Sequence, residues 1–208
     1  MIEIVSLTIG ELETNCYLVS DSETKETIVI DPADEANFIS EKIISLSLKP
    51  KIIAATHGHF DHLLAANELQ IAFEIPFLIH KKDEKLVKQM AKSAEWWLKR
   101  EIVEPIPNIN GYLAEDSIIR FGKETLRATH LPGHTPGSIA LYSLENKVCF
   151  SGDVLFENGV GRSDFSYSCR EELKKSIEKI EAKTPGFTIY PGHGRSFHPG
   201  TSPEVTPR

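Results

Sequence analysis

The sequence predicts an α/β fold in which helices cover β-sheets, and three observations support this. Short apolar segments rich in β-branched residues recur along the chain, as strands require. Stretches with apolar residues at helical spacing lie between them. The length of 208 residues suits one compact domain with a substantial core. This order of elements predicts sheets and helices in layers.

The first half of the chain alternates predicted strands with predicted helices. Strands are expected at 2–9, 16–20, 26–32, 51–56 and 75–80. Helices are expected over 35–47, from His62 to Phe73, and over 82–99. Asp34 is the expected N-cap of the first helix.

The predicted helix 82–99 carries two unusual sets of side chains. Four lysines in it or just before it are expected to form a solvated face: Lys81, Lys82, Lys85 and Lys88. Trp96 and Trp97 are adjacent, so one helix face cannot bury both. We expect one of them in the core and the other on the wall of a substrate pocket or on the surface.

The second half begins with an irregular connection over 105–111, rich in Pro, Asn and Gly. Strands are expected at 117–121, 124–130, 138–144, 147–152 and 187–190. Ser168 and Glu171 form a capping-box pattern that opens a further helix. We expect one domain over 1–194 and a mobile tail over 195–208, which is rich in turn formers.

Composition excludes several classes of function. A net charge of −7 argues against nucleic-acid binding, which needs clustered Lys and Arg. No apolar run approaches the roughly 20 residues that a membrane span requires. The N-terminus lacks the pattern of a secretory signal, and Cys16, Cys149 and Cys169 form no C-x-x-C pair. We therefore expect a cytoplasmic protein with reduced thiols and a small-molecule substrate; a homodimer is compatible with the sequence but not required by it.

The segment ATHGHFDHLLA, residues 54–64, ends a predicted strand in a cluster of metal-competent side chains. Alternation in an extended chain points His57, His59 and Asp61 to one side, and a helix beginning there turns His62 elsewhere. One corner can thus present two imidazoles to one point and a carboxylate with an imidazole to its neighbour. Two metal ions roughly 3.5–4 Å apart would fit this arrangement.

Three further corners have the same character: a predicted strand followed by glycine and a metal-competent residue. They are His134 in LPGHTPGS, Asp153 in FSGDVLF and His193 in YPGHGRS. Histidines in ordinary surface turns would explain any one of these corners, but not all four together. Imidazole and carboxylate in combination suit Zn²⁺, Fe or Mn²⁺.

These motifs resemble the metallo-β-lactamase superfamily, and within it the small glyoxalase II-like (hydroxyacylglutathione hydrolase-like) hydrolases of one domain. The similar segments span essentially the whole chain: TNCYLV (14–19), IDP (30–32), THGHFDH (56–62), LPGHTPGS (131–138), SGDVLFENGVGRSD (151–164) and YPGHG (190–194). The resemblance implies an αββα sandwich of two mixed β-sheets flanked by helices.

The resemblance also implies the ligands of two divalent metal ions, with Zn²⁺ expected and Fe or Mn²⁺ as alternatives. The first ion would be held by His57, His59 and His134, and the second by Asp61, His62 and His193, with Asp153 bridging them. In the family, a hydroxide between the metals attacks an acyl carbon, and Asp61 would orient this nucleophile.

Two departures from glyoxalase II put glutathione specificity in doubt. That enzyme continues into a helical domain with basic residues that hold glutathione, whereas 15 residues follow His193 here, with Arg195 and Arg208 as cations. It also has CGR where this chain has Val160-Gly161-Arg162. The metal-binding pattern is unaffected by either change.

Other polar residues have candidate supporting roles. Arg162 could bind a substrate carboxylate bidentately or form a salt bridge within its loop. Asp31 could accept a hydrogen bond from a metal-binding histidine or cap a turn. His130 is expected to be structural or to support the ligands rather than bind metal. We expect His80 and His198 to be ordinary surface residues.

Three functions remain open from the sequence. The first is a dinuclear-metal hydrolase of a thioester such as S-lactoylglutathione or another small acyl thiol. The second resembles the persulfide dioxygenases of the same superfamily, with a single iron on His57, His134 and Asp153. The third is a non-catalytic binding module, which the complete set of ligands disfavours.

Overall fold

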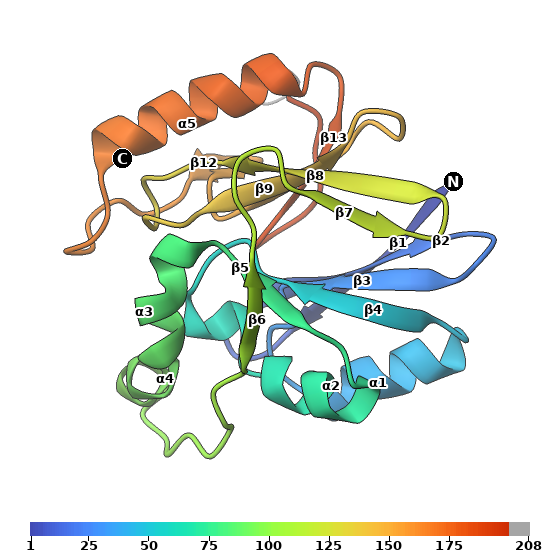
Figure 1. Cartoon of the computed structure of the whole chain (residues 1–208). Coiled ribbons are helices and arrows are strands. Elements are labelled where there is room, and N and C mark those ends of the chain that lie inside the picture. Colours follow the sequence, from blue (N-terminus) through green and yellow to red (C-terminus); the bar gives the residue numbers. More distant parts are fainter. Residues whose placement is uncertain (200–208) are drawn as a thin grey trace.

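The computed structural model describes residues 1–199 as an α/β sandwich, with two sheets face to face and helices on both outer sides (Figure 1). The predicted fold class is therefore confirmed. The first sheet has the order β1-β2-β3-β4-β5-β6. Its strands are β1 (Ile2–Ile9), β2 (Thr14–Asp21), β3 (Glu26–Ile30), β4 (Lys49–Ala54), β5 (Phe77–Ile79) and β6 (Ile109–Tyr112).

The second sheet has the order β13-β10-β9-β8-β7. Its strands are β7 (Ile118–Phe121), β8 (Glu124–His130), β9 (Ile139–Ser143), β10 (Val148–Gly152) and β13 (Thr188–Pro191). Both sheets are mixed, because β3 pairs parallel with β4 but antiparallel with β2, and β10 pairs parallel with β13 but antiparallel with β9. A small hairpin of β11 (Leu155–Phe156) and β12 (Gly159–Val160) follows β10.

The helices cover the outer faces of the two sheets. α1 (Ala36–Ser45) and α2 (Ala66–Phe73) lie on the first sheet, and α5 (Arg170–Lys183) lies on the second (Figure 1). α3 (Glu84–Lys88) and α4 (Met90–Leu98) connect β5 to β6. Two single turns of 3₁₀-helix complete the described elements, η1 (Phe60–His62) and η2 (Lys81–Asp83). No described helix combines the length and apolar character that crossing a membrane demands.

Strand alternation produces the separate apolar layers of this sandwich. In β2, Cys16 and Leu18 pack in the layer beneath α1 and α2, whereas Tyr17 and Val19 face the second sheet. Successive strand residues point to opposite faces, so a strand covered on both sides is apolar throughout. All eight residues of β2 are accordingly buried. A third apolar layer lies between the second sheet and α5.

The predicted helix 82–99 is interrupted, and the expectation for its tryptophans is wrong. Gln89 leaves the α-helical region, with φ −105° and ψ 2°, and separates α3 from α4. Val87, Met90 and Ala94 take the inward face. Trp96 and Trp97 are both exposed, at 63% and 44%, although Trp97 lies at helical spacing from Met90 and Ala94.

Helix starts and one strand also differ from the predictions. α5 begins at Arg170 after Cys169 without a side-chain cap, because the Ser168 hydroxyl donates instead to the carbonyl of His134 (2.7 Å). The N-cap of α1 is Glu35 rather than Asp34. Strand β6 (Ile109–Tyr112) forms at the end of the irregular connection predicted over 105–111.

The predicted tail is described only in its first residues. Phe197 is buried and exchanges two backbone hydrogen bonds with Ile189 of β13 (2.8 and 3.0 Å), so the chain stays on the sheet there. The remainder of the predicted mobile tail, 200–208, lies outside the described residues.

The layer between the sheets predicts a large cost for truncating Phe150. Its ring is fully buried, with ring centroids 5.2 Å from Tyr17 and 5.3 Å from Tyr190. Phe150→Ala should lower the free energy of unfolding by about 3–5 kcal/mol, because it leaves a cavity. Phe38→Ala, at an exposed position, should change it by less than about 0.5 kcal/mol. Urea denaturation of the two variants measures both values, and equal effects would contradict this account of the core.

Candidate metal centre

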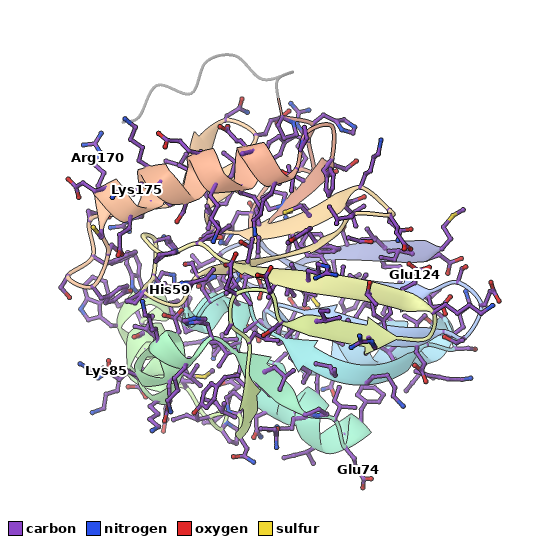
Figure 2. The ribbon with its side chains drawn as sticks, turned by 45° about the horizontal axis from the view of Figure 1, so that its top comes forward. His59, Glu74, Lys85, Glu124, Arg170 and Lys175 are labelled. Atoms are coloured by element: carbon purple, nitrogen blue, oxygen red, sulfur yellow. The ribbon has the colours of Figure 1, made fainter. Side chains whose placement is uncertain are left out.

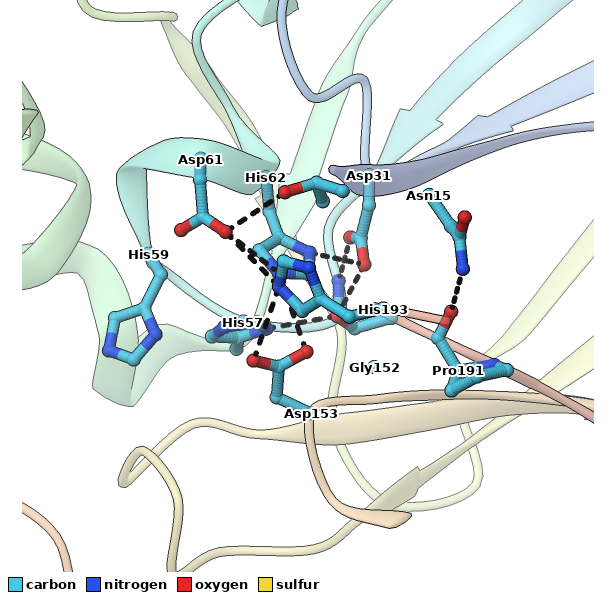
Figure 3. A network of polar contacts seen from close by, with 12 residues as sticks. Asn15, Asp31, His57, His59, Asp61, His62, Gly152, Asp153, Pro191 and His193 are labelled. Atoms are coloured by element: carbon cyan, nitrogen blue, oxygen red, sulfur yellow. Dashed lines mark hydrogen bonds and ion pairs between the residues drawn. The ribbon is translucent and has the colours of Figure 1, made fainter. Parts of the chain in front are cut away.

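The four predicted corners converge at one rim of the sandwich. His57, His59, Asp61 and His62 follow β4, His134 follows β8, Asp153 follows β10, and His193 follows β13. Figure 3 shows side chains from both sheets turned toward one another there. In Figure 2, His59 lies on the opposite side of the molecule from Glu124, where β8 begins. The site thus lies at the end of the sandwich where these strands finish.

The converging residues form two groups of potential metal ligands. One comprises His57, His59, His134 and Asp153, and the other comprises Asp61, His62 and His193; within each group the ligand atoms lie within 4.8 Å of one another. The Asp153 carboxylate also reaches the second group, with Oδ1 3.5 Å from His62 Nε2 and Oδ2 3.7 Å from His193 Nε2. A third group, Asp31 with His57 and His62, overlaps both of these.

Each histidine is held by one ring nitrogen while the other faces the cluster. His62 Nδ1 donates to the Asp31 carboxylate (2.9 Å). His134 Nδ1 donates to the Arg162 carbonyl (2.8 Å), and His193 Nδ1 donates to the Leu12 carbonyl (3.0 Å). The Nδ1–H assignments follow because the partner oxygens can only accept. In a neutral imidazole, a proton on Nδ1 leaves a lone pair on Nε2, and this is the form that binds a metal.

The two remaining histidines contact hydroxyl groups instead. His57 Nδ1 lies 3.1 Å from the Thr56 hydroxyl, and His59 Nε2 lies 2.8 Å from the Tyr167 hydroxyl. These contacts leave His57 Nε2 and His59 Nδ1 to face the cluster.

Several buried polar atoms at the centre have no hydrogen-bond partner. They are His57 Nε2, His62 Nε2 and Asp153 Oδ1. The last two are 3.5 Å apart, which is longer than a hydrogen bond. Burying polar atoms without hydrogen-bond partners costs folding free energy, and a cation bound among these atoms would compensate for that cost. The residues present therefore fit divalent metal ions.

The two groups differ in protonation. Burial lowers the pKa of His57 well below its ordinary value, and burial together with His134 lowers the pKa of His59 to about 3. Both imidazoles are consequently neutral, as a ligand must be. Burial alone would also lower the pKa of His62, but the carboxylates of Asp61, Asp31 and Asp153 raise it well above the ordinary value.

Asp31 supports the second group. Its carboxylate accepts the Thr56 amide (2.7 Å), the Thr56 hydroxyl (2.6 Å) and His62 Nδ1. The sequence suggested Asp31 as a hydrogen-bond partner of a metal-binding histidine, either His57 or His59. In the structure, the histidine that contacts Asp31 is His62.

The start of β2 also supports the site, a role that the sequence did not reveal. Thr14 donates its hydroxyl to Asp61 Oδ2 (3.0 Å). The Asn15 amide donates to the carbonyls of Pro191 (3.0 Å) and Gly194 (2.7 Å), which flank His193. Both residues lie in the segment TNCYLV, which carried part of the family resemblance without an assigned role.

Of the two roles that the sequence allowed for Arg162, the structure shows the salt bridge within its loop. Its guanidinium binds both oxygens of Asp164 (2.9 and 2.8 Å) and lies 4.4 Å from the ring centroid of Phe165. Phe165 stacks on Tyr167, with ring centroids 5.4 Å apart. These side chains form an aromatic wall beside His59, which lies 5.4 Å from Phe165.

His130 and His80 lie outside both groups. Their rings stack with centroids 4.1 Å apart, and His130 Nε2 donates to the Pro136 carbonyl (2.9 Å). His80 is 8% exposed, so the expectation of a surface residue is wrong for it. Its ring is covered because β5 and β8 end side by side here, which a local sequence pattern does not disclose.

Comparisons with known proteins agree with this geometry. The model of the metallo-beta-lactamase superfamily matches residues 9–193. Hydroxyacylglutathione hydrolase GloC of Haemophilus influenzae is 35% identical over 201 residues, covering 93% of this chain and 90% of that protein. The chain therefore belongs to the metallo-β-lactamase superfamily.

Two solved structures are similar over nearly their whole length. TTHA1623 in a di-iron-bound form has a TM-score of 0.83 and 32% identity, covering 93% of this chain and 94% of that one. The BLEG-1 B3 metallo-beta-lactamase has a TM-score of 0.86 and 28% identity, covering 94% and 93%.

The raised pKa of His62 predicts that metal binding displaces a proton. A group with a raised pKa keeps its proton at pH 7, and a metal ion must replace that proton to reach Nε2. Zinc titration at pH 7 should therefore release the proton of His62. Calorimetry in buffers of different ionisation enthalpy measures the release, and an enthalpy independent of the buffer would contradict it.

Proposed function

We propose that this chain is a metal-dependent hydrolase that cleaves small acyl thioesters with two divalent ions at the rim. His57, His59 and His134 would hold one ion, Asp61, His62 and His193 the other, and Asp153 would contact both. The observation that carries the proposal is the convergence of His57 Nε2, His62 Nε2 and Asp153 Oδ1, all buried without partners. Zinc is the expected ion; iron is the alternative supported by the di-iron form of TTHA1623, and manganese would suit the same donors.

Bound ions of this kind supply two kinds of chemistry: they activate water and polarise an acyl carbonyl. The protein supplies orientation. Burial alone would raise the pKa of Asp61, but His62 and a hydrogen bond from His193 lower it, so its carboxylate stays ionised. Thr14 fixes the rotamer of that carboxylate through Oδ2. Asp61 can then accept a hydrogen bond from a water molecule and orient it toward the substrate.

We propose that the substrate binds against the aromatic wall. The rings of Phe165 and Tyr167 lie beside His59. The Arg162 guanidinium lies over Phe165 and 5.7 Å from the ring centroid of Trp97. A substrate carboxylate would have to compete with Asp164 for Arg162. The wall therefore favours apolar contact with the thiol or acyl portion.

Similarity to GloC supports a thioester such as S-lactoylglutathione as the substrate class. The competing function is a persulfide dioxygenase with one iron on His57, His134 and Asp153, and these three residues do lie in one group. The second group favours the hydrolase, because hydrogen bonds from Thr14 to Asp61 and from His62 to Asp31 keep a second set of potential ligands in place. We further propose that the protein acts in the cytoplasm.

Metal content measured together with activity tests the proposal. The purified protein should contain about two metal ions per chain and hydrolyse S-lactoylglutathione or another small acyl thioester. Elemental analysis, a thioester assay and oxygen uptake with glutathione persulfide are run on the same preparation. One iron with oxygen consumption would identify the dioxygenase instead.

His59→Ala tests the ligand assignment. Turnover should be abolished, because the first group loses an inward-facing nitrogen. The fold should persist, because His59 belongs to the rim rather than to the apolar core. Circular dichroism and thermal unfolding check the fold, and near-normal turnover by the variant would exclude His59 as a ligand.

A further inference from the structure

A second buried aspartate, Asp83, lies behind the first group of ligands. It ends η2, and its side chain is fully buried. Its Oδ2 accepts the Gly58 amide (2.9 Å) and the Thr135 hydroxyl (2.6 Å), and its Oδ1 accepts the Gly137 amide (2.7 Å). One carboxylate thus binds three donors from two loops that are far apart in the sequence.

These donors lie next to the metal-facing histidines. Gly58 stands between His57 and His59, after β4 of the first sheet. Thr135 directly follows His134, after β8 of the second sheet. Asp83 therefore connects the two sheets at the point where each delivers ligands to the first group.

Gly58 and Gly137 both lie too close to Asp83 to carry a side chain. A Cβ on Gly58 would come 2.8 Å from Leu86 Cβ and 3.0 Å from Asp83 Cβ. A Cβ on Gly137 would come 2.6 Å from Asp83 Cγ. Atoms do not approach this closely in a packed interior, so both loops need glycine for their backbones to reach Asp83.

We propose that Asp83 is a positioning residue that sets the spacing between His59 and His134, and through it the metal affinity of the first group. The inward nitrogens His59 Nδ1 and His134 Nε2 are 3.0 Å apart, although they come from different sheets. Asp31 does the same for the second group through Thr56 and His62. The effect on metal affinity rests on the proposed metal function. The hydrogen bonds of Asp83, and the loop positions that they fix, do not depend on it.

The test is Asp83→Asn, with Asp21→Asn as its matched control. Asparagine keeps the shape but replaces one acceptor oxygen with a donor, which then faces one of the three donors. Asp21 is also fully buried and also accepts two amides and a threonine hydroxyl, from Glu23 (3.0 Å), Lys123 (2.8 Å) and Thr24 (3.1 Å). It lies beside the start of β8, because it accepts the amide of Lys123, and Figure 2 shows Glu124, the first residue of β8, on the opposite side of the molecule from His59.

Zinc and cobalt titrations against a competing chelator measure the effect. Asp83→Asn should weaken binding of the ion in the first group roughly 10–100-fold and change the visible spectrum of the cobalt form. Asp21→Asn should destabilise the fold similarly but leave affinity and spectrum as in the wild type. Wild-type affinity in folded Asp83→Asn would overturn the proposal, as would equal losses in both variants.

A milder pair of variants covers the case in which Asp83→Asn does not fold. Thr135→Val removes one donor to Asp83 and should lower metal affinity in the same direction by a smaller factor. Thr135→Ser keeps the hydroxyl and should restore wild-type affinity. Equal affinity in the valine and serine variants would overturn the proposal.

Amide hydrogen exchange in metal-free protein separates this inference from the proposed function. If the wild type binds neither zinc nor cobalt, the proposed function fails, but the exchange of Gly58 and Gly137 still decides the role of Asp83. Both amides should exchange faster in Asp83→Asn (or in Thr135→Val) than in the wild type and Asp21→Asn. Unchanged exchange at both glycines would overturn the positioning role.

Discussion

The structure depends on one constraint: imidazoles and carboxylates from both sheets are buried at a common rim, where several of their polar atoms have no hydrogen-bond partner. His57 and His62 are almost inaccessible to solvent, yet each directs an unpaired nitrogen into the cluster. Burial of such atoms opposes folding unless something compensates. A cation shared by several donors does so, which explains how a stable fold tolerates this concentration of polar groups.

The surrounding polar network turns this constraint into geometry. Asp31 holds the β4 corner to β3, and Asn15 holds the loop of His193 to β2. The carbonyls of Arg162 and Leu12 fix the tautomers of His134 and His193. These contacts orient His62, His134 and His193 without any bound ion. Such preorganisation is what a catalytic or metal site requires from its second layer of contacts.

The sequence was most informative where chemistry is local. HGHFDH brings several ligands together within six positions, and its periodicity already separates His62 from His57 and His59. The remaining corners, with His134, Asp153 and His193, could be found because the same pattern recurs in all of them, which ordinary surface turns do not explain together. The layered fold followed from strand and helix order, and the structural comparisons confirm it.

The sequence was least informative where a role depends on packing between distant segments. Asp83 lies in a lysine-rich stretch whose pattern indicates a solvated face, and its burial arises only because two remote loops close over it. Trp97 of α4 is exposed even though its helical spacing from the buried Met90 and Ala94 predicts the inward face. Neither effect leaves a periodic signal in one sequence, since both are set by tertiary contacts.

The most direct test of the central claim is anomalous X-ray diffraction from crystals grown with zinc. The account predicts two anomalous peaks at the rim, one among His57, His59 and His134 and the other among Asp61, His62 and His193, with Asp153 between them. A rim without any peak, or zinc bound only at other places on the protein, would contradict it.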